Sequence, residues 1–316
     1  MKTEVLAALT LTLWACGAPS TPDAGVDAGT DAGLIATPGT GDAGTLVGTF
    51  ALLHSNGSAS LFGKVYDGPT PATLVWELDT VDGDCRLLTP RVPFCATPCG
   101  GSAVCVENDV CQSYPASKPV GLVHVTGVLN GGGAFDMSPI NNGYQPPAAV
   151  TLAVPPFADG EPITLRADGS AAVQAFTLTT TGVMPLSLTS TALTLQPGAP
   201  LELTWPGSST ARVEVKLDIS HHGGTRGMIT CDTADDGALT ISAALTTRLI
   251  ALGVSGFPTV VVRRERVGLA LITAGRVDLR VGSELEQAVT IPGLTSCTDT
   301  SQCPMGQACQ NDLRCN

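Results

Sequence analysis

The feature that most constrains the fold is a recurring pattern of short apolar-rich runs, each ended by a dipeptide that favours a tight turn. Three runs near the start of the body end at Asn56-Gly57, Asp67-Gly68 and Asp82-Gly83. These dipeptides accept the positive φ that short hairpin turns require. Later runs alternate strictly, as in RVEVKL at 212–217, where one face is charged and the other apolar. Such alternation predicts half-buried antiparallel strands.

Roughly sixteen such runs predict an all-β chain built as an antiparallel β-sandwich, in one large domain or two adjoining domains. One segment departs from the strand pattern. Ile241–Leu252 has apolar residues at helical spacing and is closed by Gly253, which predicts one short helix. With a seam near Pro155-Pro156, the expected organisation is a first β region at 45–155 with a cysteine-rich insertion at 85–111, a second β region at 156–292, and a cysteine-rich tail at 293–316.

The first residues predict export. Lys2 precedes a short apolar run from Val5 to Trp14. A helix needs about 20 apolar residues to cross a bilayer, so this run predicts a signal peptide at residues 1–15. Its ending, Leu13-Trp14-Ala15-Cys16, resembles a lipobox, which implies cleavage before Cys16 and a lipid on its thiol. The alternative is an ordinary signal peptide followed by a chance cysteine.

The segment that follows, within residues 16–44, is of low complexity. Asp-Ala-Gly recurs at Asp23, Asp27, Asp31 and Asp42, with no aromatic residue between them. A segment with so little to bury does not offset the entropy of ordering its backbone. We therefore expect a lipidated Cys16 joined to the body by a flexible linker.

Cysteines give a second strong constraint. The chain has 11, and all but Cys16 lie in the predicted body. Export to an oxidising compartment favours disulfides for this even remainder. Eight of them form a central knuckle (Cys95, Cys99, Cys105, Cys111) and a C-terminal knuckle (Cys297, Cys303, Cys309, Cys315). The last three of each set align, CGGSAVCVENDVC with CPMGQACQNDLRC, which indicates an internal repeat.

If each knuckle closes on itself, Cys85 and Cys231 remain and should bond, with their α-carbons about 4.4–6.8 Å apart. Within a knuckle, four cysteines allow three connectivities, and the sequence does not choose among them. Alternate pairing, Cys297 with Cys309 and Cys303 with Cys315, is favoured over adjacent pairing. Zinc is the rival interpretation, but the gaps between the cysteines are looser than the usual paired two-residue gaps.

Composition and motifs restrict the chemistry. The formal charge of −12 argues against a nucleic-acid partner, because nucleic acid rewards basic stripes. Nucleophile-elbow, metalloprotease, phosphate-loop and dinucleotide-binding motifs are absent, so we predict no catalytic residue and no cofactor. A weak candidate metal site combines His221 and His222 with Asp232 and Asp235. A polar loop beside a turn explains the histidine pair better. Trp76 and Trp205 are expected to be core aromatics.

Several segments together resemble uncharacterised envelope lipoproteins of the myxobacterial type. They are LWAC, the Asp-Ala-Gly tether, CATPCGGSAVCVENDVCQSYP, LELTWPG, CDTADDGALTI and the CTDTSQCPMGQAC tail. The resemblance implies a place in the cell envelope, at the outer membrane and facing the periplasm or the cell surface. It implies no catalytic residue.

The sequence thus predicts a membrane-anchored envelope lipoprotein with a non-catalytic β-sandwich body. Its partners would be the membrane, through lipid on Cys16, and an unknown glycan or protein. The competing hypothesis is a secreted metal-dependent hydrolase that uses His221, His222 and the nearby aspartates.

Overall fold

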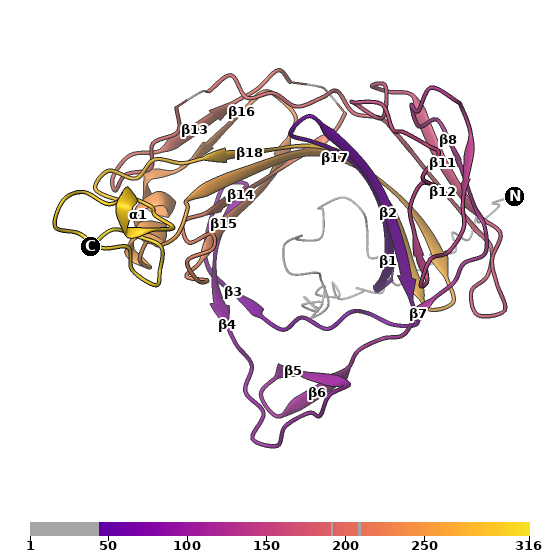
Figure 1. Ribbon diagram of the computed structural model, residues 1–316, viewed down its shortest axis with the longest axis horizontal. Coiled ribbons are helices and arrows are strands. Elements are labelled where there is room, and N and C mark those ends of the chain that lie inside the picture. Colours follow the sequence, from indigo (N-terminus) through magenta and orange to yellow (C-terminus); the bar gives the residue numbers. More distant parts are fainter. Residues whose placement is uncertain (1–43, 191, 208–209) are drawn as a thin grey trace, which may run out of the picture.

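The computed structural model describes residues 44–190, 192–207 and 210–316. The predicted signal peptide at 1–15, the predicted lipidation site Cys16 and the linker up to residue 43 lie outside the described residues. The described body is almost entirely β structure, as the alternating runs predict (Figure 1).

A 10-stranded sheet, called the large sheet below, forms the centre of the molecule, in the order β10-β2-β1-β18-β17-β14-β15-β4-β3 with β7 beside β2. Its strands are β1 (Leu46–Ser55), β2 (Ser58–Tyr66), β3 (Val75–Asp82), β4 (Cys85–Arg91), β7 (Ser117–Lys118), β10 (Gly143–Tyr144), β14 (Arg212–Asp218), β15 (Met228–Ala234), β17 (Thr259–Ile272) and β18 (Gly275–Ala288). Its neighbouring strands pair antiparallel except for β1 and β18, the first and last strands of the body, which are parallel.

Two smaller sheets and a helix cover one side of the large sheet. The second sheet has the order β12-β11-β8-β9. Its strands are β8 (Val123–Thr126), β9 (Phe135–Met137), β11 (Pro162–Ala167) and β12 (Phe176–Thr181). The third sheet pairs β13 (Leu201–Thr204) with β16 (Ala238–Ile241), beside α1 (Ala243–Ala251). The central knuckle holds the hairpin β5 (Ala103–Glu107) and β6 (Val110–Ser113), and the C-terminal knuckle holds the short helix η1 (Thr300–Gln302).

The sandwich has two hydrophobic clusters, one under each covering layer. The first joins the large sheet to the second sheet, as where Phe50 and Leu165 are buried together. The second joins the large sheet to the third sheet and α1, through residues such as Val215 and Leu249. The long hairpin of β17 and β18 contributes to both clusters. This arrangement confirms the predicted β-sandwich and makes the large sheet common to both clusters.

The two clusters do not divide at the expected seam near residue 155. The first takes Leu52 from before the seam and Leu178 from after it. The second takes Leu87 from before the seam and Leu217 from after it. The reason is the topology, because β3 and β4 pair beside β15 rather than beside β2, the strand that precedes them.

The α-helix found among the described residues, Ala243–Ala251, confirms the prediction of a short helix within Ile241–Leu252, although Ile241 itself ends β16. Ser242 is its N-cap, and the Ser242 Oγ accepts a hydrogen bond from the Leu245 N–H at 3.3 Å. Leu245 and Leu249 are fully buried one turn apart, against the second cluster. Gly253 follows with a φ of +97°, the left-handed conformation that ends helices.

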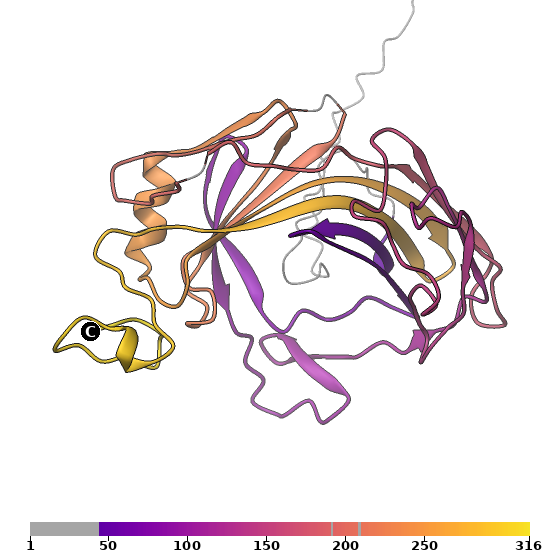
Figure 2. The same ribbon diagram turned by 45° about the horizontal axis from the view of Figure 1, so that its top comes forward.

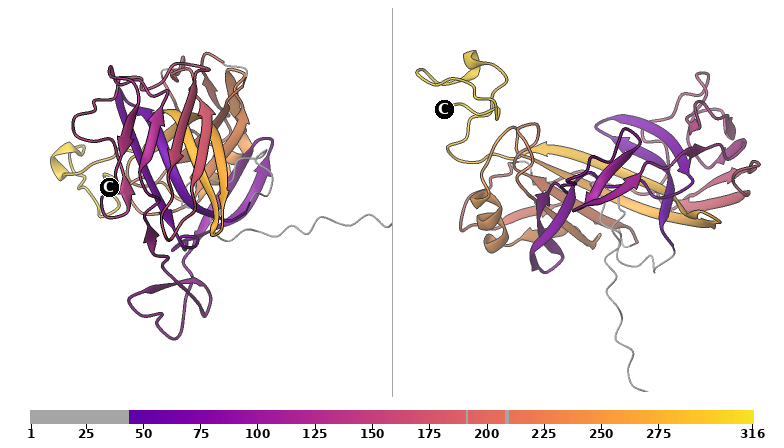
Figure 3. Two further views of the ribbon diagram at one scale, coloured as in Figure 1. Left: turned by 90° about the vertical axis from the view of Figure 1, so that its right-hand side faces the viewer. Right: turned by 90° about the horizontal axis from the view of Figure 1, so that it is seen from below.

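The large sheet curls strongly, and both covering layers lie outside the curl (Figures 1 and 2). Two segments connect its far edges: a strap at residues 67–74 between β2 and β3, and the central knuckle between β4 and β7 (Figure 1). The central knuckle projects from the body (Figure 3). The Asp67 N–H donates to the Ala116 carbonyl at 3.1 Å and ties the strap to the end of the knuckle. The inner side of the curl is called the concave face below.

Candidate functional site

Strand alternation decides which residues occupy the concave face. Successive side chains of a strand point to opposite faces. On β14, Val213, Val215 and Leu217 belong to the second hydrophobic cluster, outside the curl. Arg212 and Glu214, which alternate with them, therefore point to the concave face. On β17, Val262 and Arg264 lie opposite Val215 and Val213 and therefore point outside the curl with them. Glu265, the next residue, points to the concave face.

The register of the neighbouring strands gathers charged residues there. Glu214 lies opposite Asp232 of β15 on one side and Arg263 of β17 on the other. Arg212 lies opposite Glu265, and Arg263 lies opposite Glu284 of β18. The resulting charge cluster consists of Arg212, Glu214, Asp232, Arg263, Glu265, Arg276, Asp278, Arg280 and Glu284.

Part of the charge cluster is paired. The Arg212 Nε donates to Asp232 Oδ1 at 2.8 Å, and the Arg212 Nη2 donates to the Asp232 carbonyl at 2.9 Å. The Arg263 Nε donates to Glu284 Oε2 at 2.8 Å. These are charge-assisted hydrogen bonds across adjacent strands. They hold one end of the cluster in a fixed geometry.

The rest of the cluster is buried with incomplete hydrogen bonding, although Arg276 lies 2.9 Å from Asp278. Glu265 and Asp278 are each 2% exposed and Arg280 is 8% exposed. Glu265 Oε1, Asp278 Oδ1 and the Arg280 Nε and Nη1 make no hydrogen bond to the described residues. The Arg280 Nη1 lies 3.7 Å from Glu265 Oε1, too far for a hydrogen bond. Each such group costs about 1–3 kcal/mol, and more when it is charged. Unsatisfied buried charges in one place mark a candidate binding site.

The electrostatics of the site place a proton on Glu214. Burial and then the neighbouring Glu265 charge raise the pKa of Glu214 to about 8, against the opposing effect of Arg280 and Arg263. Burial also raises the pKa values of Asp232 and Asp278 above their ordinary value. At pH 7 Glu214 is therefore a neutral hydrogen-bond donor within the cluster.

Gly282 is a buried glycine in the middle of the charge cluster. It lies opposite Glu265 on β17 and Leu53 on β1, between Arg280 and Glu284 along β18. A Cβ at this position would lie 3.2 Å from the Arg264 carbonyl oxygen and 3.4 Å from the Glu265 Cβ. The glycine therefore lets β17 and β18 approach each other closely.

Aromatic residues lie on the concave face at the edges of the large sheet. Phe62 of β2 is 52% exposed, and Trp76 of β3 is half-buried. Trp76 is in neither hydrophobic cluster, and its Nε1 is buried without a partner among the described residues, so its expected role as a core aromatic is wrong. Trp205 is a core aromatic, as predicted, with its Nε1 donating to Asp235 Oδ1 at 2.8 Å.

The structure does not assemble the weak candidate metal site. His221 and His222 lie in the loop between β14 and β15, with ring centroids 3.9 Å apart. Asp232 and Asp235 lie toward the opposite end of β15, about 20 Å away at the rise of a strand. Asp232 is bound to Arg212, and Asp235 is buried against Arg264. The two aspartates are therefore bound to arginines and far from the histidines.

The histidine loop instead supports the C-terminal knuckle. Gly256 has a φ of +58°, and its N–H donates to the Asp312 carbonyl of the knuckle at 2.7 Å. A Cβ on Gly223 would lie 2.3 Å from the Gly256 nitrogen, and one on Gly256 would lie 2.0 Å from the His221 carbonyl oxygen. The glycines of this loop are required because three backbone segments meet there.

The disulfides follow the predicted count. Cys85 bonds Cys231, directly opposite it on adjacent antiparallel strands. Their α-carbons are 4.0 Å apart, slightly closer than the expected range because cross-strand partners lie so near each other. Both knuckles pair alternately: Cys95–Cys105, Cys99–Cys111, Cys297–Cys309 and Cys303–Cys315. The cysteine triads that lie close enough to hold a metal are thus engaged in disulfides.

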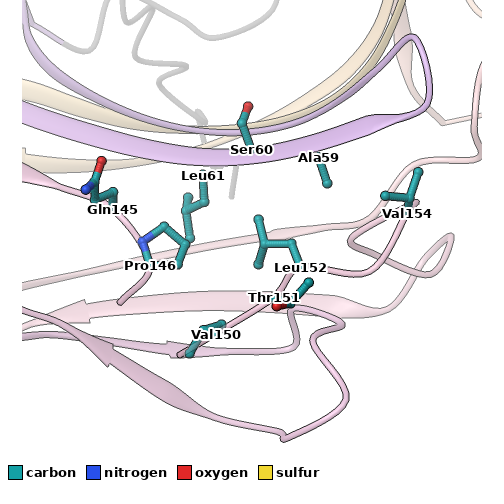
Figure 4. Close-up of a pocket in the computed structure, with 9 residues that line it drawn as sticks. All are labelled: Ala59, Ser60, Leu61, Gln145, Pro146, Val150, Thr151, Leu152 and Val154. Atoms are coloured by element: carbon teal, nitrogen blue, oxygen red, sulfur yellow. The ribbon is translucent and has the colours of Figure 1, made fainter. Parts of the chain in front are cut away.

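A separate hollow of about 440 Å³ lies between β2 and the segment 145–154. Leu61, Pro146 and Leu152 point into it, as Figure 4 shows. Its lining combines apolar residues with Ser60, Gln145 and Thr151 and contains no charged side chain. The absence of charge distinguishes it from the charge cluster.

Sequence reasoning missed the charge cluster. The alternation in RVEVKL reveals one charged face, but only the register of β14, β15, β17 and β18 brings those faces together. Within the described part of the chain, no helix is long and apolar enough to cross a membrane. Neither a protein-family model nor a curated protein matches the sequence.

Proposed function

We propose that this chain is an envelope lipoprotein, anchored through lipid on Cys16, whose β body binds a glycan or protein partner at the concave face without catalysing a reaction. The anchor is supported by the short apolar run and the LWAC ending, and the tether by the Asp-Ala-Gly tract. A diacyl anchor has two chains, enough for stable attachment where one chain is marginal.

The observation that carries the binding function is the set of buried charges on the concave face whose hydrogen bonds are incomplete among the described residues. Glu265, Asp278 and Arg280 are fixed on strands whose opposite faces are packed in the two hydrophobic clusters. Rigid strands hold such groups in place more precisely than loops do. A partner that hydrogen-bonds to these groups recovers the free energy that their burial costs. The metal-dependent hydrolase has no comparable support, because His221 and His222 lie far from Asp232 and Asp235.

Mass spectrometry of the N-terminal peptide tests the anchor. We expect a mature chain that starts at an acylated Cys16, and we expect Cys16→Ser to release the protein from membranes. Thr21→Ser, a similar change in the tether, is the control and should leave the protein attached. An unmodified N-terminus beyond residue 16 contradicts this part of the proposal.

Retention of envelope material tests the binding function. The Cys16→Ser protein is immobilised, and wild-type and Glu265→Gln/Arg280→Gln versions are compared for the glycan and protein that they retain. Each lost charge-assisted hydrogen bond is worth about 1.5–3 kcal/mol, so we expect at least about a tenfold loss in the double variant. Arg166→Gln, an exposed arginine of the second sheet, is the matched control. Equal retention by all versions contradicts the proposal.

A further inference from the structure

We infer that β2 binds an extended, uncharged segment of a partner protein along Ser58–Leu61, where the segment adds one strand to the large sheet and places apolar side chains in the hollow beside residues 145–154. None of these residues belongs to the charge cluster, so the inference goes beyond the proposed function. Three observations support it: free backbone groups on β2, an open hollow beside them, and an edge without the usual protection.

The register of β1 and β2 shows which backbone groups of β2 point outward. The two-residue turn at 56–57 makes Ser55 and Ser58 a hydrogen-bonded pair, and such pairs alternate along an antiparallel ladder. The odd-numbered residues of β2 therefore direct their N–H and C=O away from β1, to what is called the outer edge below. The Asp67 N–H follows this rule just beyond the strand, because it donates to the Ala116 carbonyl at 3.1 Å.

Only part of the outer edge is paired. β10 and β7 pair with it at Gly63 and Val65. At Ala59 and Leu61 the outward N–H and C=O make no hydrogen bond to the described residues. β10 cannot extend as far as Leu61, because its continuation reaches Pro146, which has no N–H to donate. The edge is therefore left free over Ser58–Leu61.

A hollow gives access to this free part of the outer edge. It has a volume of about 440 Å³ and is open to solvent between β2 and segment 145–154. Figure 4 shows Ala59 and Leu61 on the side of β2 that faces this segment, while Ser60 points the other way. Alternate side chains of an added strand would share the side of Ala59 and Leu61 and point toward Pro146 and Leu152. The hollow thus favours apolar side chains at alternate positions of the ligand.

The spacing of the free groups identifies the ligand as a polypeptide. Ala59 and Leu61 are two residues apart, about 6.8 Å at the rise of an antiparallel strand, and each offers one donor and one acceptor. An extended peptide repeats a donor and an acceptor at this interval, as in β-strand addition. The hollow contains no charged side chain, so a charged group placed in it would lose hydration without gaining a partner. We therefore expect an uncharged segment.

The two outer strands of the large sheet differ in their protection. β3, at the far edge, carries the exposed acidic residues Glu77, Asp79 and Asp82, and its pairing with β4 contains a register shift. Charges and bulges of this kind oppose the addition of another strand. The free part of β2, SASL at 58–61, has no charge, no proline and no register shift. This edge therefore lacks the features that keep other chains away.

A second copy of this chain fits the outer edge less well than a single segment does. A two-fold pair of copies brings the same patch of each copy against the other. Segment 145–154, which forms one wall of the hollow, would then meet its own counterpart. A single extended segment brings no such wall with it and enters the hollow alone.

Hydrogen exchange followed by nuclear magnetic resonance tests the inference on the full-length Cys16→Ser protein. The probe is an acetylated and amidated hexapeptide of alternating valine and threonine. We expect the amides of Ala59 and Leu61 to exchange quickly in the free protein and at least about tenfold more slowly with saturating peptide. The amides of Gly63 and Val65 should exchange slowly in both states. N-methylation of the valines, whose N–H groups would face β2, should abolish the protection, and N-methylation of the threonines should not.

Two lysine substitutions one residue apart provide the matched control. Ala59→Lys places a charge beside the hollow and should weaken peptide binding by about fivefold or more, whereas Ser60→Lys, on the other side of β2, should not. Ala59→Pro removes one outward N–H and leaves the pairing with β1 intact, so it should also weaken binding by about fivefold or more. Far-ultraviolet circular dichroism checks that each variant is folded.

The contrary results are distinct. Absence of protection, equal protection by the two N-methylated peptides, or equal binding by Ala59→Lys and Ser60→Lys overturns the inference. Protection without peptide that rises with protein concentration identifies a second copy as the occupant and overturns the assignment to a partner. Protection without peptide at every concentration shows an edge that is already covered, and it also overturns the assignment. Retention by the Glu265→Gln/Arg280→Gln protein tests the proposed function separately, because it does not involve the outer edge.

Discussion

Arg264 and Glu265 are consecutive residues of β17, both buried, on opposite faces of the large sheet. Arg264 is fully buried outside the curl, and its Nε donates to Asp235 Oδ2 at 2.6 Å. Its Nη2 donates to Asp235 Oδ1 at 2.9 Å and its Nη1 donates to the Met184 carbonyl at 2.9 Å. Glu265 is 2% exposed on the concave face, and its Oε1 lies 3.7 Å from the Arg280 Nη1 without a hydrogen bond to any described residue.

The difference separates a structural charge from a binding charge. Both residues lose hydration on folding, and only Arg264 recovers it within the described chain. Asp235 also accepts from the Trp205 Nε1, so the Arg264 network connects β17 to the second hydrophobic cluster. A closed network of this kind specifies the fold. Glu265 belongs to no such closed network, since its Oε1 has no hydrogen bond among the described residues.

The largest effect on stability should come from breaking the closed network of Arg264, Asp235 and Trp205. Arg264→Met leaves Asp235 as a buried, uncompensated charge and should cost about 3–5 kcal/mol in the free energy of unfolding. Urea denaturation measures it. Arg263→Met, whose ion pair with Glu284 on the concave face is only partly buried, is the control and should cost about 1 kcal/mol or less. Equal costs at the two positions would remove the distinction between the two faces.

Replacing Glu265 and Arg280 with apolar residues should not destabilise the protein, in contrast to Arg264→Met. Glu265→Leu with Arg280→Met removes two buried, poorly satisfied charges, which should leave stability unchanged or raise it by about 1 kcal/mol or more. Binding at the concave face should be lost in the same protein. The measurement is again urea denaturation, beside the retention of envelope material. A loss of several kcal/mol would show that this pair supports the fold as Arg264 does.

A smaller effect should appear as a pH dependence of the unfolding free energy that is caused by Glu214. Its pKa is raised from 4.5 to about 8, so the folded state binds a proton that the unfolded state releases. This contribution to stability is complete below about pH 4.5 and is lost as pH rises through about 8. Unfolding free energies across this range should therefore fall less steeply in Glu214→Gln. Identical slopes in the variant and the wild type would mean that Glu214 ionises normally.

The sequence anticipates those parts of this comparison that depend on local pattern. Alternation predicts the charged face of β14, the helical spacing predicts α1, and counting predicts the Cys85–Cys231 bond. The run RRER at 263–266 shows its limit, because four charged residues in a row do not reveal that Arg264 meets Asp235 on one face while Glu265 faces Arg280 on the other. Which partner each of these residues meets depends on how distant strands pair. The same long-range pairing places β3 and β4 beside β15 and away from β2.

An exposed histidine on the second sheet provides the smallest effect and tests whether burial matters. His124 Nδ1 lies 2.7 Å from Asp136 Oδ1, and its Nε2 lies 3.1 Å from Asp168 Oδ2. Hydrogen bonds to Asp168 and then Asp136 raise the pKa of His124 above its ordinary 6.5. The stabilisation is complete below pH 6.5 and is lost as pH rises through the raised pKa of His124.

Because this cluster is exposed, salt should weaken it, whereas the pH dependence at Glu214 should persist. Titration of His124 by nuclear magnetic resonance should give a raised pKa that moves toward its ordinary value in about 0.5 M NaCl, where the Debye length is only a few ångströms. His124→Gln should remove the corresponding pH dependence of stability and leave that of Glu214 intact. The contrary result is that salt changes the pH dependence of stability at Glu214 as much as it changes the pKa of His124. In that case the charge cluster on the concave face is as exposed to solvent as His124 and its two aspartates. Burial then does not explain why atoms of the charge cluster lack hydrogen bonds.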